Sequence, residues 1–228
     1  MKGYGQFCPV AMGAEVFAER WTPLILRELL AGARHFAQLH RGLPRISRNL
    51  LTLRLDALQH AGIIEKQVAA NGRGYEYCLT AAGREFNPVI EALGTWGYKW
   101  CTRDLRDEQI DPDHLMWVLR RLVRIENLPL RRVVICFRFR QNPNRRFWLV
   151  LNRPEVDVCL KDPGFETDVE VLADLRALAD ICLGHLSFQT ASWQGKVVLS
   201  GPSHYREELA NWIGVTRFAT SNRLGVVG

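Results

Sequence analysis

Residues 43–61 read LPRISRNLLTLRLDALQHA, and the N-terminal half of the chain is organised around them. Ser47 suits the N-cap of a helix, because its hydroxyl can accept a hydrogen bond from an amide one turn further on. Leu51, Leu55 and Leu58 recur at helical spacing and predict one buried stripe. The sequence therefore predicts a helix that starts after Ser47 and has a polar outer face.

That outer face carries side chains that can donate to DNA phosphates or to base edges: Arg48, Asn49, Thr52 and Arg54. No carboxylate lies between Glu28 and Asp56. The same window contains Arg34, Arg41, Arg45, Arg48 and Arg54. A basic surface without acids favours a polyanionic partner. The alternative is an amphipathic helix that uses arginine for solubility, and the neighbouring elements decide between the two.

Those neighbours predict a winged helix-turn-helix. A first helix is expected over residues 8–18. A second is expected to begin at Thr22 as N-cap, with Pro23 at its first position. A third is expected over residues 36–41, followed by a turn over residues 42–46. Strands are expected at Ile63–Val68 and Tyr75–Leu79. Asn71-Gly72 is typical of a hairpin turn, and Arg73 at its tip is a candidate phosphate contact.

A helix capped by Thr80 is expected to run to about Trp100, with a possible kink at Pro88. Its apolar residues recur at steps of four, three and four, which is typical of a coiled-coil seam. The residues are Val89, Leu93, Trp96 and Trp100. Since this seam follows a small domain that is already complete, we expect it to pair with a second copy.

The length and net charge of the chain limit the number of domains and the kinds of partner. The chain has 228 residues, enough for two modest domains, and a net charge of +6. Residues 1–105 hold 13 Lys and Arg against 9 Asp and Glu, and the remainder hold 17 against 15. No apolar run approaches the ~18–20 residues of a membrane span, and the N-terminus lacks the apolar core of a signal peptide. We expect a cytoplasmic protein with no membrane partner.

The motifs of common enzymes and cofactor sites are missing from the sequence. It has no HExxH, GxSxG or P-loop pattern, and none of its six cysteines is spaced as CxxC. The sequence therefore predicts no enzyme, no cofactor and no metal site. The cysteines are expected to be free thiols.

A polar segment over residues 104–112 separates the two predicted domains, 1–105 and 106–228. The second half predicts an α+β fold with a mostly antiparallel sheet of about five strands. An amphipathic helix is expected from Leu115 to Ile125 and a turn at residues 141–145. Strands are expected at residues 132–140, 147–152, 156–160, 169–172 and 196–200, and helices at 175–183 and 205–213.

The first hundred residues resemble the HxlR-type family of bacterial winged helix-turn-helix regulators. Cys8-Pro9-Val10, the run from Arg20 to Leu29, the run from Ile46 to Leu55, Gly62-Ile63-Ile64, Thr80 and Gly83 carry the resemblance. It implies a dimeric transcription factor that binds operator DNA. Many members keep a cysteine where Cys8 stands, and some use it as a redox sensor. From the sequence, a buried inert thiol is the alternative for Cys8.

The second half resembles a sterol-carrier-protein-type domain. The resemblance is carried by Asp174-Leu175, Leu178, Gly184, residues 195–201 and Trp212. It implies a pocket for a small apolar ligand under the sheet. The candidate walls are Ile135, Phe137, Phe139, Trp148 and Trp193, and ordinary core packing is the alternative for each.

These expectations combine into a dimeric DNA-binding regulator with a C-terminal ligand sensor. The candidate DNA contacts are Arg45, Ser47, Arg48, Asn49, Thr52, Arg54 and Arg73. One alternative is a thiol-based redox regulator that uses Cys8 and has a structural second domain. Another is a lipid-binding carrier module with a basic domain for localisation.

Overall fold

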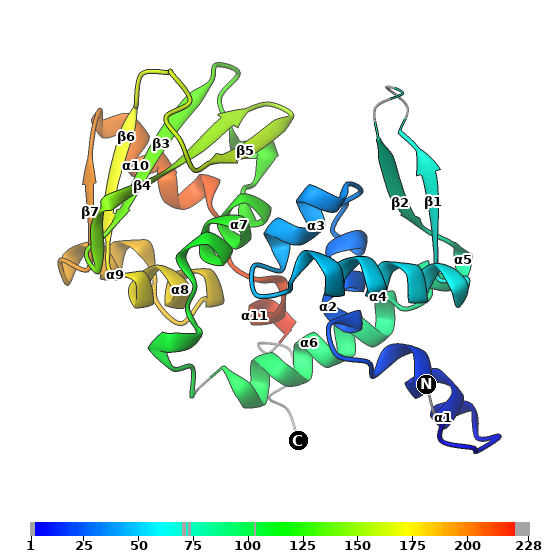
Figure 1. Ribbon diagram of the computed structural model, residues 1–228. Helices are drawn as coiled ribbons and strands as arrows, with labels where there is room; N and C mark the ends of the chain where they lie inside the picture. Colours follow the sequence, from blue (N-terminus) through cyan, green and yellow to red (C-terminus); the bar gives the residue numbers. More distant parts are fainter. Residues whose placement is uncertain (1–2, 70–71, 73, 103, 222–228) are drawn as a thin grey trace. The chain divides into compact units, whose positions relative to one another are not determined.

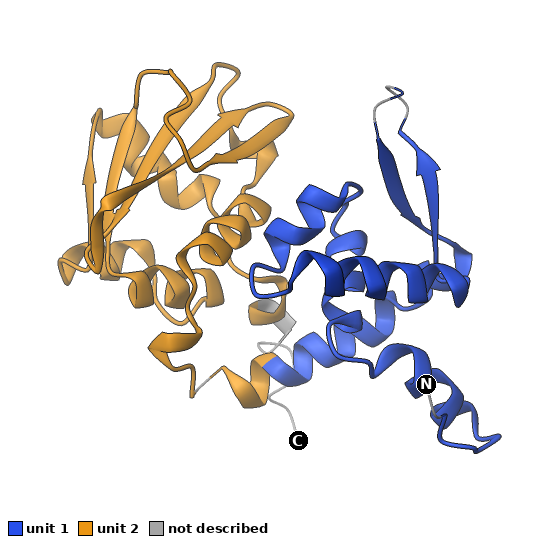
Figure 2. Cartoon of the chain, viewed as in Figure 1, with its two compact units in different colours: residues 1–97 blue, residues 98–228 orange. Residues whose placement is uncertain are grey.

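The computed structural model describes residues 3–69, 72, 74–102 and 104–221. The chain divides into two compact units, residues 1–97 (unit 1) and residues 98–228 (unit 2) (Figure 2). Each unit has a hydrophobic core of its own. Among the described residues, no helix is both long enough and apolar enough to cross a bilayer.

Unit 1 combines helices with a two-stranded antiparallel sheet (Figure 1). Its elements are α1 (Pro9–Phe17), α2 (Thr22–Leu30), α3 (Phe36–Gly42), α4 (Arg48–His60), β1 (Ile64–Val68), β2 (Tyr75–Leu79), α5 (Ala81–Arg84) and most of α6 (Asn87–Cys101). Helices α3 and α4 form the helix-turn-helix, and β1 and β2 form the wing. The predicted winged helix-turn-helix is confirmed.

The predicted stripe of α4 forms the centre of the unit 1 core. Leu51, Leu55 and Leu58 are at most 2% exposed and belong to one cluster with Ile25 and Leu26 of α2. The Ser47 hydroxyl accepts a hydrogen bond from the Leu50 amide at 3.3 Å, as expected of an N-cap. The local pattern of residues 47–58 thus determines both where the helix begins and which face is buried.

Thr80 and Gly83 attach α5 to the base of the wing. The Thr80 hydroxyl donates to the Gly62 carbonyl at 2.7 Å and accepts from the Gly83 amide at 3.2 Å. A methyl group added at Gly83 would overlap the carbonyl oxygen of Ile63. Glycine is therefore required here by close backbone approach.

Two helix boundaries in unit 1 differ from the prediction. The helix expected from Thr80 to Trp100 is two helices, α5 and α6, because Pro88 has no amide hydrogen to donate to the Arg84 carbonyl. Pro88 is instead accepted in the first turn of α6. Thr22 begins α2 rather than capping it, and the N-cap is Trp21, whose φ of 79° is left-handed.

Unit 2 is built on a five-stranded sheet in the order β5-β4-β3-β6-β7. Its strands are β3 (Val133–Phe139), β4 (Asn142–Asn152), β5 (Glu155–Cys159), β6 (Val169–Ala173) and β7 (Val197–Ser200). Strands β3 and β6 are parallel and all other pairs are antiparallel. The predicted mostly antiparallel α+β architecture is confirmed.

Helices cover one face of this sheet (Figure 1). They are α7 (Pro112–Leu122), α8 (Leu175–Leu183), α9 (Phe188–Trp193) and α10 (Ser203–Trp212). Unit 2 also contains α11 (Arg217–Ser221) and the short 3-10 helices η1 (Asp107–Gln109) and η2 (Ile125–Asn127). Alternate residues of β3, Ile135 and Phe137 among them, pack against Leu119 of α7, Leu178 of α8 and Leu209 of α10, and all five are fully buried. The period of two along β3 thus selects the core face.

Three details of unit 2 differ from the prediction. The turn expected over residues 141–145 is tighter, and β4 already begins at Asn142, because the register shifts between Arg138 and Phe139 and brings Asn142 opposite Phe139. Helix α7 ends at Leu122, so that Ile125 lies in η2 and is 39% exposed. The segment Phe188–Trp193, for which no helix was predicted, is helix α9, capped by Ser187.

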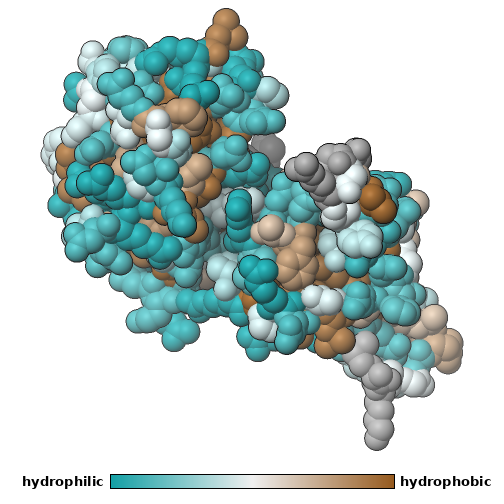
Figure 3. Space-filling model, turned by 45° about the horizontal axis from the view of Figure 1, so that its top comes forward, coloured by the Kyte–Doolittle hydropathy of each residue, from teal (hydrophilic) through white to brown (hydrophobic). Residues whose placement is uncertain are grey.

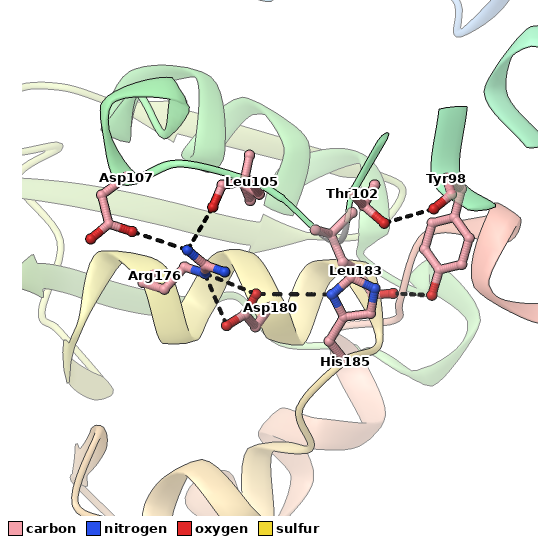
Figure 4. Close-up of polar contacts among 8 residues, drawn as sticks. All are labelled: Tyr98, Thr102, Leu105, Asp107, Arg176, Asp180, Leu183 and His185. Carbon is pink, nitrogen blue, oxygen red and sulfur yellow. Dashed lines mark hydrogen bonds and ion pairs between the residues drawn. The ribbon is translucent and has the colours of Figure 1, made fainter. Parts of the chain in front are cut away.

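A polar cluster fixes the first residues of unit 2 to α8 (Figure 4). Arg176 donates to the Leu105 carbonyl at 2.8 Å, to Asp107 at 3.1 Å and to Asp180 at 3.2 Å. These carboxylates, Asp107 first, raise the pKa of Arg176 above its usual value. The Tyr98 hydroxyl donates to the Leu183 carbonyl at 2.8 Å. Unit 2 therefore begins at Tyr98, inside α6.

Candidate nucleic-acid interface

The outer face of α4 presents three polar side chains to solvent. Arg48, Asn49 and Thr52 are exposed. Arg48 and Asn49 are adjacent, and Thr52 lies one helical turn further on. The Thr52 hydroxyl donates to the Arg48 carbonyl at 3.1 Å, so its oxygen can still accept a hydrogen bond. Arginine, asparagine and threonine placed in this way can read guanine, adenine and thymine edges in a major groove.

The N-terminal end of α4 adds two further groups. Ser47 and Arg45 are exposed beside it, and the Ser47 oxygen already caps the helix. The hydroxyl hydrogen of Ser47 can still donate to a phosphate. The free amides and the dipole at the start of a helix of this length also favour a phosphate.

Arg54 departs from the predicted set of DNA contacts. Its guanidinium is 2.7 Å from the Glu19 carboxylate and its side chain is only 18% exposed. At 100° per residue, position 54 is turned away from Arg48 and Asn49 and toward Glu19, and a DNA contact by Arg54 stays a prediction. Arg73 lies outside the described residues.

The wing contributes a cation that the sequence reasoning missed. Lys66 on β1 is exposed, and its ammonium lies 4.4 Å from the centre of the Tyr75 ring and 5.9 Å from that of Tyr77. The rings hold the lysine along the hairpin. The available signal was a lysine within the predicted wing strand Ile63–Val68.

The predicted seam on α6 is exposed along its whole length. Val89, Leu93, Trp96 and Trp100 are 43%, 46%, 58% and 59% exposed, whereas Ile90 on the inner face is buried. Figure 3 shows hydrophobic residues, in brown, reaching the surface on the face drawn. Four large apolar side chains in one row on a helix are costly to leave in water.

Cys8 lies at the N-cap of α1 and is exposed, so the interpretation as a buried thiol is wrong. Amide hydrogen bonds from Ala11 and Val10 hold the pKa of the Cys8 thiol below its usual value. The burial prediction failed because α1 has no buried residues. Cys182 in the unit 2 core shows the opposite shift, because burial raises the pKa of its thiol to about 12.

The five candidate ligand-pocket residues of unit 2 do not meet around one space. Ile135, Phe137 and Phe139 are at most 2% exposed within the core under the helices. Trp148 lies on the opposite face of the sheet with Val134, Cys136 and Val150, and Trp193 is 87% exposed. The predicted lining is wrong, because strand alternation separates Trp148 from the first three residues.

The pattern of the family described as HxlR-like helix-turn-helix matches residues 16–105. An uncharacterised HTH-type transcriptional regulator of Synechocystis sp., sll1512, is 39% identical over 101 residues, which are 44% of this chain and 75% of that protein. The Bacillus subtilis regulator YdeP, also uncharacterised, is 32% identical over 97 residues, which are 42% of this chain and 76% of that protein.

Among solved structures, the redox regulator HypR in its reduced form is 28% identical, with a TM-score of 0.39 over 42% of this chain and 95% of that chain. The fold of unit 1 is that of a winged helix-turn-helix protein. The chain belongs to the HxlR-like helix-turn-helix family.

Proposed function

We propose that this protein is a transcriptional regulator that binds operator DNA as a homodimer. The observation that carries the proposal is the exposed face of α4, where Arg48, Asn49 and Thr52 lie within a segment free of carboxylates. Membership of a family whose relatives are named HTH-type transcriptional regulators supports it. Arg48, Asn49 and Thr52 are the base-reading residues. Arg45, Ser47, Lys66 and Arg73 contact phosphates.

The seam on α6 is the dimer contact. Burial of Val89, Leu93, Trp96 and Trp100 against the same row of a second copy removes their exposed apolar area from water. A twofold axis at this seam repeats the recognition helix. Two such helices read a pseudo-palindrome with half-sites about one helical turn, roughly 10 base pairs, apart.

The test is selection of bound duplexes from a random library with the full chain at fixed salt. Enrichment of a pseudo-palindrome with that spacing is expected. A library that returns no enriched sequence would falsify operator binding. An enriched sequence without twofold symmetry would contradict the dimer and leave DNA binding intact.

Cys8 favours a second input, thiol oxidation. The thiolate is the reactive form, and a lowered pKa increases its fraction near neutral pH. Alkylation by iodoacetamide, followed by peptide mass spectrometry, is expected to modify Cys8 at lower pH than a cysteine in an unfolded peptide. Cys182 should stay unmodified, because its pKa of about 12 and its burial suppress the thiolate.

Added hydrogen peroxide would oxidise the Cys8 thiolate to a sulfenic acid and be reduced to water, and this treatment then has to change operator affinity in the wild type and not in Cys8→Ser. Equal loss of affinity in both proteins would assign the effect to another thiol. Unit 2 is the structural partner in this scheme, since its core residues Ile135, Phe137 and Phe139 are buried in its hydrophobic core. Its likeness to sterol-carrier proteins stays a prediction.

A further inference from the structure

A hollow of about 300 Å³ opens on unit 1 between the C-terminal end of α2 and strand β2, with Arg84 of α5 at its edge. Leu29, Tyr77 and Leu79 supply apolar walls. Gly32, with a φ of 91°, lines the hollow without a side chain. Pockets for small molecules are typically apolar, with a small number of polar groups that fix orientation.

Four side chains with polar atoms line this hollow: Arg34, Tyr77, Cys78 and Arg84. Arg34 donates from Nη1 to the Cys78 sulfur at 3.2 Å, and Arg84 donates from Nη1 to the Leu79 carbonyl at 2.7 Å. Among the described residues, neither guanidinium forms an ion pair with a carboxylate. A thiol sulfur is a weak acceptor, and each guanidinium has five donors. Both arginines are exposed and keep donors for a stronger acceptor.

Other arginines of unit 1 show that carboxylates are used where they are present. Arg27 lies 2.7 Å from Glu28, and Arg54 lies 2.7 Å from Glu19. At the hollow, two arginines line one apolar-walled space, and among the described residues no carboxylate pairs with either guanidinium. A carboxylate oxygen in place of the Cys78 sulfur would form a charge-assisted, bidentate pair.

We propose that this hollow is a binding site for a small organic monocarboxylate. The carboxylate lies between Arg34 and Arg84, and the apolar body lies against Leu29, Tyr77 and Leu79. The volume limits the ligand to a single small ring or a short acyl chain, at the lower end of ordinary ligand pockets.

The site connects the two parts of the DNA-binding unit. The Tyr77 amide donates to the Arg34 carbonyl at 2.8 Å, and the His35 ring lies 3.3 Å from the Tyr75 carbonyl. Arg34 and His35 directly precede α3, and Tyr75 and Tyr77 belong to the wing. A ligand bound here bears on the position of the wing relative to the helix-turn-helix. It regulates if it binds the DNA-competent and incompetent conformations unequally.

The binding test needs no DNA, so it is independent of the proposed operator function. Benzoate, phenylacetate and hexanoate are titrated into the full chain by calorimetry, and benzamide is the neutral match for benzoate. At least one carboxylate is expected to bind with a Kd on the order of 1 mM, and benzamide is not. Arg34→Gln and Arg84→Gln should each weaken binding about ten-fold or more. Arg20→Gln, an exposed arginine of the same unit that packs on Trp21, is the matched control.

A second readout locates the ligand. Bound carboxylate should slow alkylation of Cys78, which is partly buried in the hollow, and leave the exposed Cys8 unchanged. Absence of binding by all three carboxylates overturns the proposal, as does equal binding of benzamide. Binding without protection of Cys78 also overturns it, because the ligand is then elsewhere.

Operator DNA is the competing source of an anion. One outcome would show that the arginines hold phosphates and that the proposal is wrong. In that outcome, Arg34→Gln and Arg84→Gln lower operator affinity, each reduces the slope of log affinity against log salt concentration by about one, and no carboxylate protects Cys78. If a carboxylate that protects Cys78 also shifts operator affinity about 5-fold or more, the site is regulatory.

Discussion

Arginine has different roles in the two units. In unit 2, arginines on the surface of the sheet and helices are paired within the unit: Arg131 with Asp168, Arg138 with Glu170, Arg140 with Asp174, Arg145 with Asp113 and Arg176 with Asp107 and Asp180. In unit 1, Arg48 on α4 and Arg34 and Arg84 at the hollow form no ion pair with a described residue. Unit 1 also pairs Arg27 with Glu28 and Arg54 with Glu19, so the difference lies in these three exposed arginines, which leave a local positive field.

Exposed apolar side chains are arranged differently in the two units. In unit 1, Val89, Leu93 and Trp96 are exposed in one row on α6. In unit 2, exposed apolar side chains such as Leu130 and Trp193 lie on separate segments, and the large side chains of β3 and of the helices that cover it are buried. A continuous apolar row on one helix is the feature that the proposed dimer contact would cover.

The largest effect is expected from Leu93→Asp on α6. A carboxylate in a buried apolar seam loses its hydration without a partner, so the dimer should dissociate. Sedimentation is expected to show a monomer, and operator affinity should fall roughly a hundred-fold or more, since each half-site is then bound alone. Thr95→Asp, on the side of α6 turned away from the seam, is the matched control. If the Leu93→Asp protein remains a dimer, the dimer interface lies on another surface of the molecule.

Gly83→Ala should lower the stability of unit 1 by about 3 kcal/mol, because its methyl group meets the Ile63 carbonyl at the base of the wing. Denaturant unfolding measures the effect. Gly97→Ala, where no atom lies within 4 Å of the added carbon, is not expected to lower the midpoint. Equal midpoints for wild type and Gly83→Ala would contradict the close packing of α5 on the wing.

Arg48→Ala should weaken specific operator binding by about 1–3 kcal/mol if the guanidinium reads a base. Titration at fixed salt against the selected operator and against duplexes altered at single positions locates the contact. Arg73→Ala should act evenly across sequences and flatten the salt dependence. If Arg48→Ala leaves operator affinity unchanged, α4 does not read the groove with this face.

The smallest effect is expected in unit 2. Arg145→Gln removes an exposed ion pair with Asp113, so the free energy of unfolding should change by about 0.5 kcal/mol or less. Operator affinity should be unaltered. A loss comparable to that of Arg48→Ala would show that unit 2 also contacts DNA and would remove the contrast between the units.

The sequence alone determined the periodic and capped elements. Ser47 with Leu51, Leu55 and Leu58 specified α4, and the alternation at Val133–Phe139 specified β3, because helical and strand periods are local properties of the chain. The exposed polar face of α4 followed from the same period. The absence of carboxylates between Glu28 and Asp56 was likewise visible in the sequence.

Only the tertiary structure decided which side chains meet. It paired Arg54 with Glu19, placed Trp148 behind the sheet, exposed Cys8 and brought Arg34 and Arg84 to one hollow. Arg34 and Arg84 are fifty positions apart in the chain. Such contacts depend on how α2, α5 and the wing pack together, and packing is set by the whole core rather than by a local pattern.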